Sequence, residues 1–125
     1  MVMILGIDPG LACTGWGIIN KEGSAIKYLA SGVIKTDSDQ KIELRLNHMF
    51  NELKLMLAQY QPGSAALEET FVNMNSQSSL KLAHARGAIM VALAQSGLAV
   101  AQYAPNLIKK SLVGYGRAEK PQMIH

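Results

Sequence analysis

The chain has 125 residues, of which 49% are hydrophobic, and its formal net charge is +3. This composition excludes a disordered or fibrous protein and fits one globular domain with a real core. The single cysteine, Cys13, excludes an internal disulfide and a cysteine-based zinc site. The mild basic excess is compatible with a polyanionic partner but does not identify one.

The sequence shows no targeting or membrane-spanning pattern. The apolar stretch at residues 2–7 is short, has no basic region before it and runs into Asp8, so it does not resemble a secretory signal. No apolar run reaches the length that a transmembrane helix needs. We therefore expect a cytoplasmic protein that does not enter a membrane.

The first third of the chain predicts three strands. Residues 2–7 are almost continuously apolar, which is typical of a central strand that is buried on both faces. The turn residues of 8–10 end this strand sharply. Residues 15–20 and 26–35 read as the second and third strands, and 21–24 as the turn between them, so we expect an antiparallel meander.

The rest of the chain alternates between helices and strands. Apolar residues recur at helical spacing from Ile42 to Leu57, and Ser38 or Asp39 can cap this helix. The further expected elements are a strand at 64–68, a loop at 69–75, a helix at 76–96 closed by Gly97, a strand at 98–103, a helix at 105–113 and a last helix from about 119. Because crossover connections make the later strands parallel to the first, the sequence predicts an α/β domain with a mixed five-stranded sheet flanked by helices.

Two carboxylates follow apolar strands directly. Asp8 ends the first strand and Glu68 ends the strand at 64–68. If both strands are central and parallel, their carboxyl ends lie side by side, where open α/β sheets bind ligands. Taken alone, Asp8 is better explained as a turn residue before Pro-Gly, and Glu69 as a solvated loop acid. As a pair, Asp8 and Glu68 would repel unless a cation neutralised them, and oxygen ligands favour Mg²⁺ or Mn²⁺.

Four segments together resemble the RuvC family of Holliday-junction resolvases. They follow the family's order and are residues 3–10 with 14–17, 66–71, 79–87 and 113–120. The first segment is only moderately specific, because other RNase H-like proteins share it. The four segments together are a highly specific match to the family, and they span essentially the whole chain.

This resemblance implies an RNase H-like fold and a homodimeric endonuclease that resolves four-way DNA junctions in recombination and repair. It assigns Asp8 and Glu68 as catalytic, metal-binding carboxylates. It assigns Phe71 to the junction centre, where an aromatic ring can stack on bases. Lys109 and Lys120 match basic residues that handle DNA phosphates. The resemblance also implies a branch-migration complex, RuvA and RuvB in that family, as a partner.

The helix at 76–96 carries two further expectations. Lys81 and Arg86 lie on or near it and could touch the DNA backbone, although solubility alone explains most lysines. In the family this helix also forms the dimer. Its apolar residues suit both burial against the sheet, through Leu82, Ile89 and Leu93, and contact with a partner. The partner-facing set is Leu80, Ala83, Gly87, Met90 and Ala94.

The chain departs from the family pattern at its end. The family carries two more aspartates on a last helix, whereas no Asp follows Asp39 here. We therefore interpret residues 1–125 as a single RNase H-like nuclease domain truncated before the last catalytic helix. We expect this form to cleave junctions poorly.

Three other functions stay open from the sequence. A YqgF-type RNase H-like nuclease shares Ile-Asp-Pro-Gly but not the segment at 79–87. An actin-like or sugar-kinase ATPase opens with a similar turn, but those chains are much longer, and no Gly-Lys-Ser/Thr phosphate loop occurs here. A non-catalytic, junction-binding dimer would bind tightly without nicking.

Overall fold

The computed structural model describes residues 2–69 and 76–103. It contains five strands and two helices within these ranges. In chain order they are β1 (Val2–Asp8), β2 (Cys13–Glu22), β3 (Ala25–Lys35), α1 (Ile42–Tyr60), β4 (Ser64–Glu68), α2 (Ser76–Gln95) and β5 (Ala99–Tyr103).

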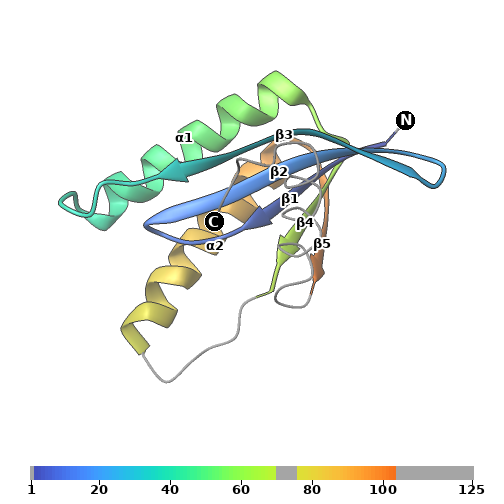
Figure 1. The fold of residues 1–125 in the computed structure, drawn as a ribbon. Helices are drawn as coiled ribbons and strands as arrows, with labels where there is room; N and C mark the ends of the chain where they lie inside the picture. The colour runs from blue at the N-terminus through green and yellow to red at the C-terminus, as the bar shows by residue number, and fades with distance from the viewer. Residues whose placement is uncertain (1, 70–75, 104–125) are drawn as a thin grey trace, which may run out of the picture.

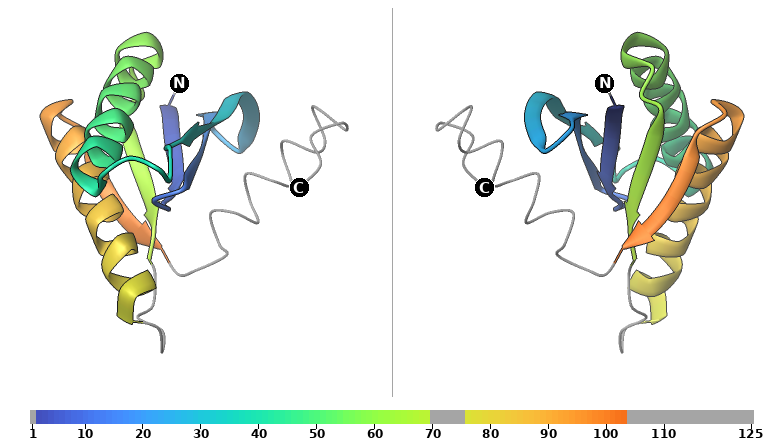
Figure 2. Two further views of the ribbon diagram at one scale, coloured as in Figure 1. Left: turned by 90° about the vertical axis from the view of Figure 1, so that its left-hand side faces the viewer. Right: turned by 90° about the vertical axis from the view of Figure 1, so that its right-hand side faces the viewer.

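The strands form one mixed sheet in the order β3-β2-β1-β4-β5 (Figure 1). β1, β2 and β3 pair antiparallel, as the predicted meander requires, whereas β4 pairs parallel with both β1 and β5. Figure 2 shows α1 and α2 side by side on one face of this sheet. The described part of the chain therefore confirms the predicted α/β architecture, with β1 at the centre.

Side chains along the central strands point alternately to the two faces of the sheet. Leu5 and Ile7 on β1 and Leu67 on β4 are fully buried under the helices, together with Ile18 on β2. The helices contribute Met49, Leu53, Ile89 and Leu93 to the same core. Because side chains alternate between the faces, the residues between these positions point to the opposite side, away from α1 and α2.

Two local predictions were wrong. The first concerns the start of α1: neither Ser38 nor Asp39 caps it, because the helix begins later, with Lys41 at the N-cap and no side-chain cap bond. Asp37 accepts a hydrogen bond from the Asp39 amide at 2.9 Å, so residues 37–40 form a turn of their own. The second is the β2–β3 turn, which is confined to residues 23–24 because Gly23 takes a φ of 61° and lets the strands pair up to Glu22.

Other boundaries follow the sequence closely. Gly97 ends α2 with a φ of 75°, and the Leu98 amide donates back to the Leu93 carbonyl at 3.2 Å. This geometry is the usual glycine-terminated helix end. The helices expected at 105–113 and from 119, and most of the 69–75 loop, lie outside the described residues. Neither described helix is long and apolar enough to cross a lipid bilayer.

Trp16 packs across a gap that only glycine leaves open. Its indole lies 5.7 Å, centroid to centroid, from the ring of Tyr60 at the end of α1. On the neighbouring strand its registered partner is Gly32. A Cβ atom built at Gly32 would lie 2.8 Å from the indole Cζ2, closer than real Cβ contacts allow. The meander therefore needs glycine at this position in order to seat the tryptophan against α1.

We expect Gly32→Ala to destabilise the fold by about 1–3 kcal/mol, the usual cost of forcing an extra carbon into a packed site. Urea denaturation followed by circular dichroism measures this change. Gly63→Ala is the matched control, because a Cβ there would meet only the Met3 carbonyl oxygen at an ordinary 3.9 Å. Equal free energies of unfolding for the two variants would contradict this packing argument.

Candidate active site

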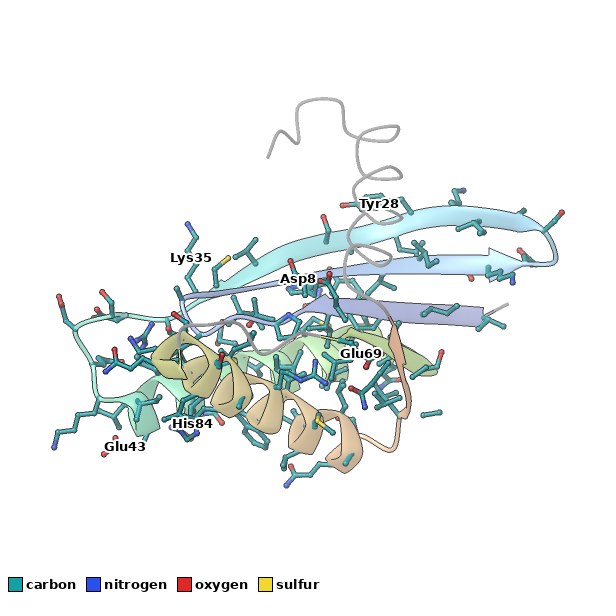
Figure 3. All side chains as sticks on the ribbon, turned by 90° about the horizontal axis from the view of Figure 1, so that it is seen from below. Asp8, Tyr28, Lys35, Glu43, Glu69 and His84 are labelled. Carbon is teal, nitrogen blue, oxygen red and sulfur yellow. The ribbon has the colours of Figure 1, made fainter. Side chains whose placement is uncertain are left out.

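The parallel register brings Asp8 and Glu68 to one rim of the sheet. β1 and β4 pair from Ile4 with Ser64 to Ile7 with Leu67, so the next residue on each strand is a carboxylate. Neighbouring strands lie about 4.8 Å apart, and paired positions share a face. Since Ile7 and Leu67 point to the helices, Asp8 and Glu68 point to the other side. Figure 3 shows Asp8 there, at the end of β1.

The two carboxylates differ in their surroundings. Glu68 is 4% exposed, whereas Asp8 is half-buried. Burying a carboxylate beside another is costly, so this rim favours binding of a cation. Glu69, the next residue, is exposed, as expected for a solvated acid.

The donor set suits a hard divalent cation but is small. Two carboxylates offer oxygen ligands of the kind that Mg²⁺ and Mn²⁺ prefer. Among the described residues no cluster of three or more His, Cys, Asp or Glu side chains could hold a metal ion. The described part of the rim thus fits part of a magnesium or manganese site, with Asp8 and Glu68 as its ligands.

The turn after Asp8 is held by a buried hydroxyl. Thr14 is fully buried, and its Oγ1 donates to the Gly10 carbonyl at 2.7 Å and accepts the Gly10 amide at 3.3 Å. Gly10 has no room for a side chain, because a Cβ would lie 2.5 Å from the Cys13 carbonyl oxygen. These contacts fix the chain immediately beyond Asp8.

A second set of bonds anchors the same turn from α1. Thr36 donates its hydroxyl to the Leu11 carbonyl at 2.6 Å and its amide to the Ala12 carbonyl at 3.1 Å. The buried Arg45 in turn donates its Nε to the Thr36 hydroxyl at 3.0 Å. Sequence reasoning missed this network, since its members are distant in the chain and none follows a motif.

Glu68 is held through its backbone. Arg86, on α2, donates from Nη1 to the Glu68 carbonyl oxygen at 2.6 Å and from Nη2 to the Gln102 Oε1 at 2.5 Å. The arginine therefore bridges the ends of β4 and β5. The prediction that Arg86 touches DNA is not tested by these contacts, but they give its guanidinium a role inside the domain.

The other predicted site residues fall in different places. Lys81 is exposed on α2, in keeping with a surface contact. Phe71, Lys109 and Lys120 lie outside the described residues, so their predicted roles stay predictions.

One basic residue at this rim was not predicted. Lys35 is exposed at the end of β3, and Figure 3 shows it pointing to the same side as Asp8. The sequence could have predicted this position. In an antiparallel meander β3 runs in the same direction as β1, so Lys35, its last residue, lies at the same edge of the sheet as Asp8.

This combination defines a class of protein. A mixed five-stranded sheet with two carboxylates at the ends of its central parallel strands is the framework of an RNase H-like nuclease. A family model described as crossover junction endodeoxyribonuclease RuvC matches residues 4–125. This chain therefore belongs to the RuvC family.

Relatives and solved structures agree with this assignment. Crossover junction endodeoxyribonuclease RuvC of Sphingopyxis alaskensis is 52% identical over 122 residues, which cover 98% of this chain and 78% of the relative. A Thermus thermophilus RuvC structure aligns with a TM-score of 0.76 and 29% identity, covering 96% of this chain and 74% of that one. A structure of T. thermophilus RuvC in complex with Holliday junction substrate aligns with a TM-score of 0.78 and 26% identity. This alignment covers 90% of this chain and 70% of that one. The RNase H-like fold is thereby confirmed.

We expect Thr14→Val to cost about 1–3 kcal/mol of stability, because the amide and carbonyl of the half-buried Gly10 lose their hydroxyl partner. Thr14→Ser keeps the hydroxyl and serves as the control. Urea denaturation of both variants gives the comparison. A valine variant as stable as the serine variant would show that the hydroxyl does not hold the turn.

Proposed function

We propose that this chain is an endonuclease that nicks four-way DNA junctions by metal-dependent phosphodiester hydrolysis. The observation that carries the proposal is the in-register ending of β1 and β4, which sets Asp8 and Glu68 together on one face in a member of the RuvC family. The solved relative bound to a Holliday junction supports the substrate class. A nuclease of this kind acts in recombination and repair, and the proposal includes a cytoplasmic location.

The chemistry follows from the two carboxylates. They would hold Mg²⁺ or Mn²⁺, which supplies an activated water and stabilises charge on the leaving oxygen. Asp8 and Glu68 themselves place two anionic groups at fixed positions on a rigid sheet. The hydrogen bonds of Thr14 and Thr36 hold the turn that follows Asp8, and they would limit its movement when a substrate binds.

We propose that DNA approaches the face of the sheet that lies opposite the two helices. Gly15 is the registered partner of Asp8, and a Cβ atom at Gly15 would meet nothing within 4 Å. A phosphate can therefore come close to the backbone beside Asp8. Lys35 on this face would attract the phosphates, and Lys81 on α2, Lys109 and Lys120 are proposed as further backbone contacts. Phe71 is proposed to stack on bases at the junction centre.

The proposal also includes a homodimer. The predicted outer residues of α2, Leu80, Ala83, Gly87, Met90 and Ala94, are all exposed, whereas Ile89 and Leu93 are buried against the sheet. α1 adds Leu44 and Leu55, which are 50% and 66% exposed. An apolar surface of this kind on the helix layer suits a second copy of the chain. RuvA and RuvB stay proposed partners on the resemblance alone.

A specific observation supports a second candidate, a junction-binding dimer without nuclease activity. The resemblance implies four metal-binding carboxylates, and among the described residues no group of three or more His, Cys, Asp or Glu side chains could hold a metal ion. The YqgF-type alternative has less support, because RuvC relatives at about half identity cover nearly the whole chain.

We expect Asp8→Asn and Glu68→Gln each to reduce Mn²⁺-dependent nicking of a synthetic four-way junction at least 100-fold while leaving junction binding within about twofold. Each amide keeps the size of the side chain but removes the anionic ligand. Single-turnover assays with excess protein measure nicking, and gel shifts in EDTA measure binding. Glu69→Gln is the control. If the three variants nick at the same rate, Asp8 and Glu68 are not the metal ligands of the reaction.

For the dimer, we expect Met90→Glu to shift the protein to monomer in sedimentation velocity, because a buried charge without a partner opposes association. Ile26→Glu introduces the same charge on the β2–β3 hairpin, away from the helix layer, and should leave the dimer intact. A parent protein that sediments as a monomer at tens of micromolar would remove the dimer from the proposal.

A further inference from the structure

We infer that Arg86 is a positioning residue for Glu68, acting together with Gln102, and that it is not primarily a DNA contact. The inference rests on the proposed role of Glu68 as a metal ligand. It assigns to one arginine and one glutamine the task of fixing the last residue of β4, and with it the direction of the Glu68 carboxylate.

The position of Arg86 on α2 directs it to the sheet. Ala85, Ile89, Ala92 and Leu93 are the fully buried residues described on this helix, and Arg86 adjoins them and is half-buried. The exposed residues Ala83, Gly87 and Met90 lie on the outer side. Arg86 thus belongs to the sheet-facing side of the helix, where a long side chain can lie along apolar groups and reach the strand ends.

The two acceptors of Arg86 come from adjacent strands. Leu67 of β4 is registered with Gln102 of β5. Registered residues share a face of a parallel sheet, and Leu67 is fully buried under the helices, so Gln102 points toward α2 as well. Its amide oxygen is thereby placed to accept from the same guanidinium that binds the Glu68 carbonyl.

Arg86 binds β4 at the last residue of the strand. β4 ends at Glu68, where its pairing with β5 also ends, and its pairing with β1 ends one residue earlier, at Leu67. A strand end that bears a metal ligand would otherwise fray, and its carboxylate would lose its orientation. A charge-assisted bond to an arginine is stronger than a neutral one and fixes the backbone at this point.

Arginine is the residue type that this arrangement requires. Its planar fork presents two donors at a fixed separation, which bind one acceptor on each strand. A lysine ammonium carries the same charge but cannot span both acceptors in the same geometry. A residue that bridges two internal acceptors also has fewer donors left for a phosphate, so a positioning role and a DNA-binding role make different predictions.

The test measures Mn²⁺ binding and junction binding separately. Paramagnetic broadening of backbone amide NMR signals near residues 8 and 68, titrated with Mn²⁺ alone, gives the metal midpoint. Gel shifts of a synthetic four-way junction in EDTA at several salt concentrations give the affinity and its salt slope. The variants are Arg86→Met, Arg86→Lys, Gln102→Met and, as the surface comparison on the same helix, Lys81→Met.

We expect Arg86→Met to raise the Mn²⁺ midpoint about tenfold, the usual effect of losing a residue that orients a ligand. Gln102→Met, which removes no charge, should raise it in the same direction by a smaller factor. Arg86→Lys should show most of the arginine effect. Junction affinity and salt slope should stay at the parent values in these three variants. Lys81→Met should instead lower the salt slope by about 0.9, the value for one lost phosphate contact, and leave the Mn²⁺ midpoint unchanged.

Two results would overturn the inference while the proposed function stands. One is a lower salt slope for Arg86→Met with an unchanged Mn²⁺ midpoint, which would make Arg86 a phosphate contact. The other is an unchanged midpoint for Gln102→Met, which would remove the two-strand bridge. If Mn²⁺ fails to broaden signals near residues 8 and 68 in the parent protein, the metal site itself is wrong, and this inference fails with it.

Discussion

The site depends on one constraint, the parallel and in-register pairing of β1 with β4. Burial of Leu5, Ile7, Ala65 and Leu67 under the helices sets this register. A slip of one residue on either strand would turn its apolar side chains to the opposite face and carry its terminal carboxylate to the helix side. Hydrophobic burial in the middle of the sheet therefore decides whether two acids meet at its end.

Register alone does not hold the carboxylates still, because both sit on the last residue of a strand. At the end of each strand, side chains from other parts of the chain form hydrogen bonds that hold the backbone. On the β1 side, Thr14 and Thr36 bind the turn that follows Asp8, and the buried Arg45 supports Thr36 from α1. On the β4 side, Arg86 binds the Glu68 carbonyl. Backbone groups that would fray in isolated strands are in this way tied to the helix layer.

The sequence predicted the elements well because their signals are local. A continuous apolar run, or apolar residues at helical spacing, can be recognised without knowledge of the rest of the chain. Glycine at position 97 marks a helix end by its own conformational freedom. The meeting of Asp8 with Glu68 was also predictable. It follows from the handedness and direction of crossover connections rather than from side-chain detail.

What the sequence could not predict are contacts between distant side chains. Arg45 looks like an ordinary charged residue of an amphipathic helix, and only the position of Thr36 explains its burial. Arg86 resembles a surface cation for the same reason, since its partner Gln102 lies on the following strand. The helix cap at Ser38 or Asp39 was wrong because Asp37 captures the nearby amide first, a local competition that propensities do not rank.

These contacts give α2 two functions on opposite sides. Arg86 and Gly87 are consecutive residues, yet one reaches the strand end that carries Glu68 and the other lies on the exposed apolar surface. Both residues belong to one helix, and the buried side chains Ala85, Ile89 and Leu93 pack that helix against the sheet. The same packing therefore fixes the position of the Arg86 donors at the end of β4 and the direction in which the apolar surface faces.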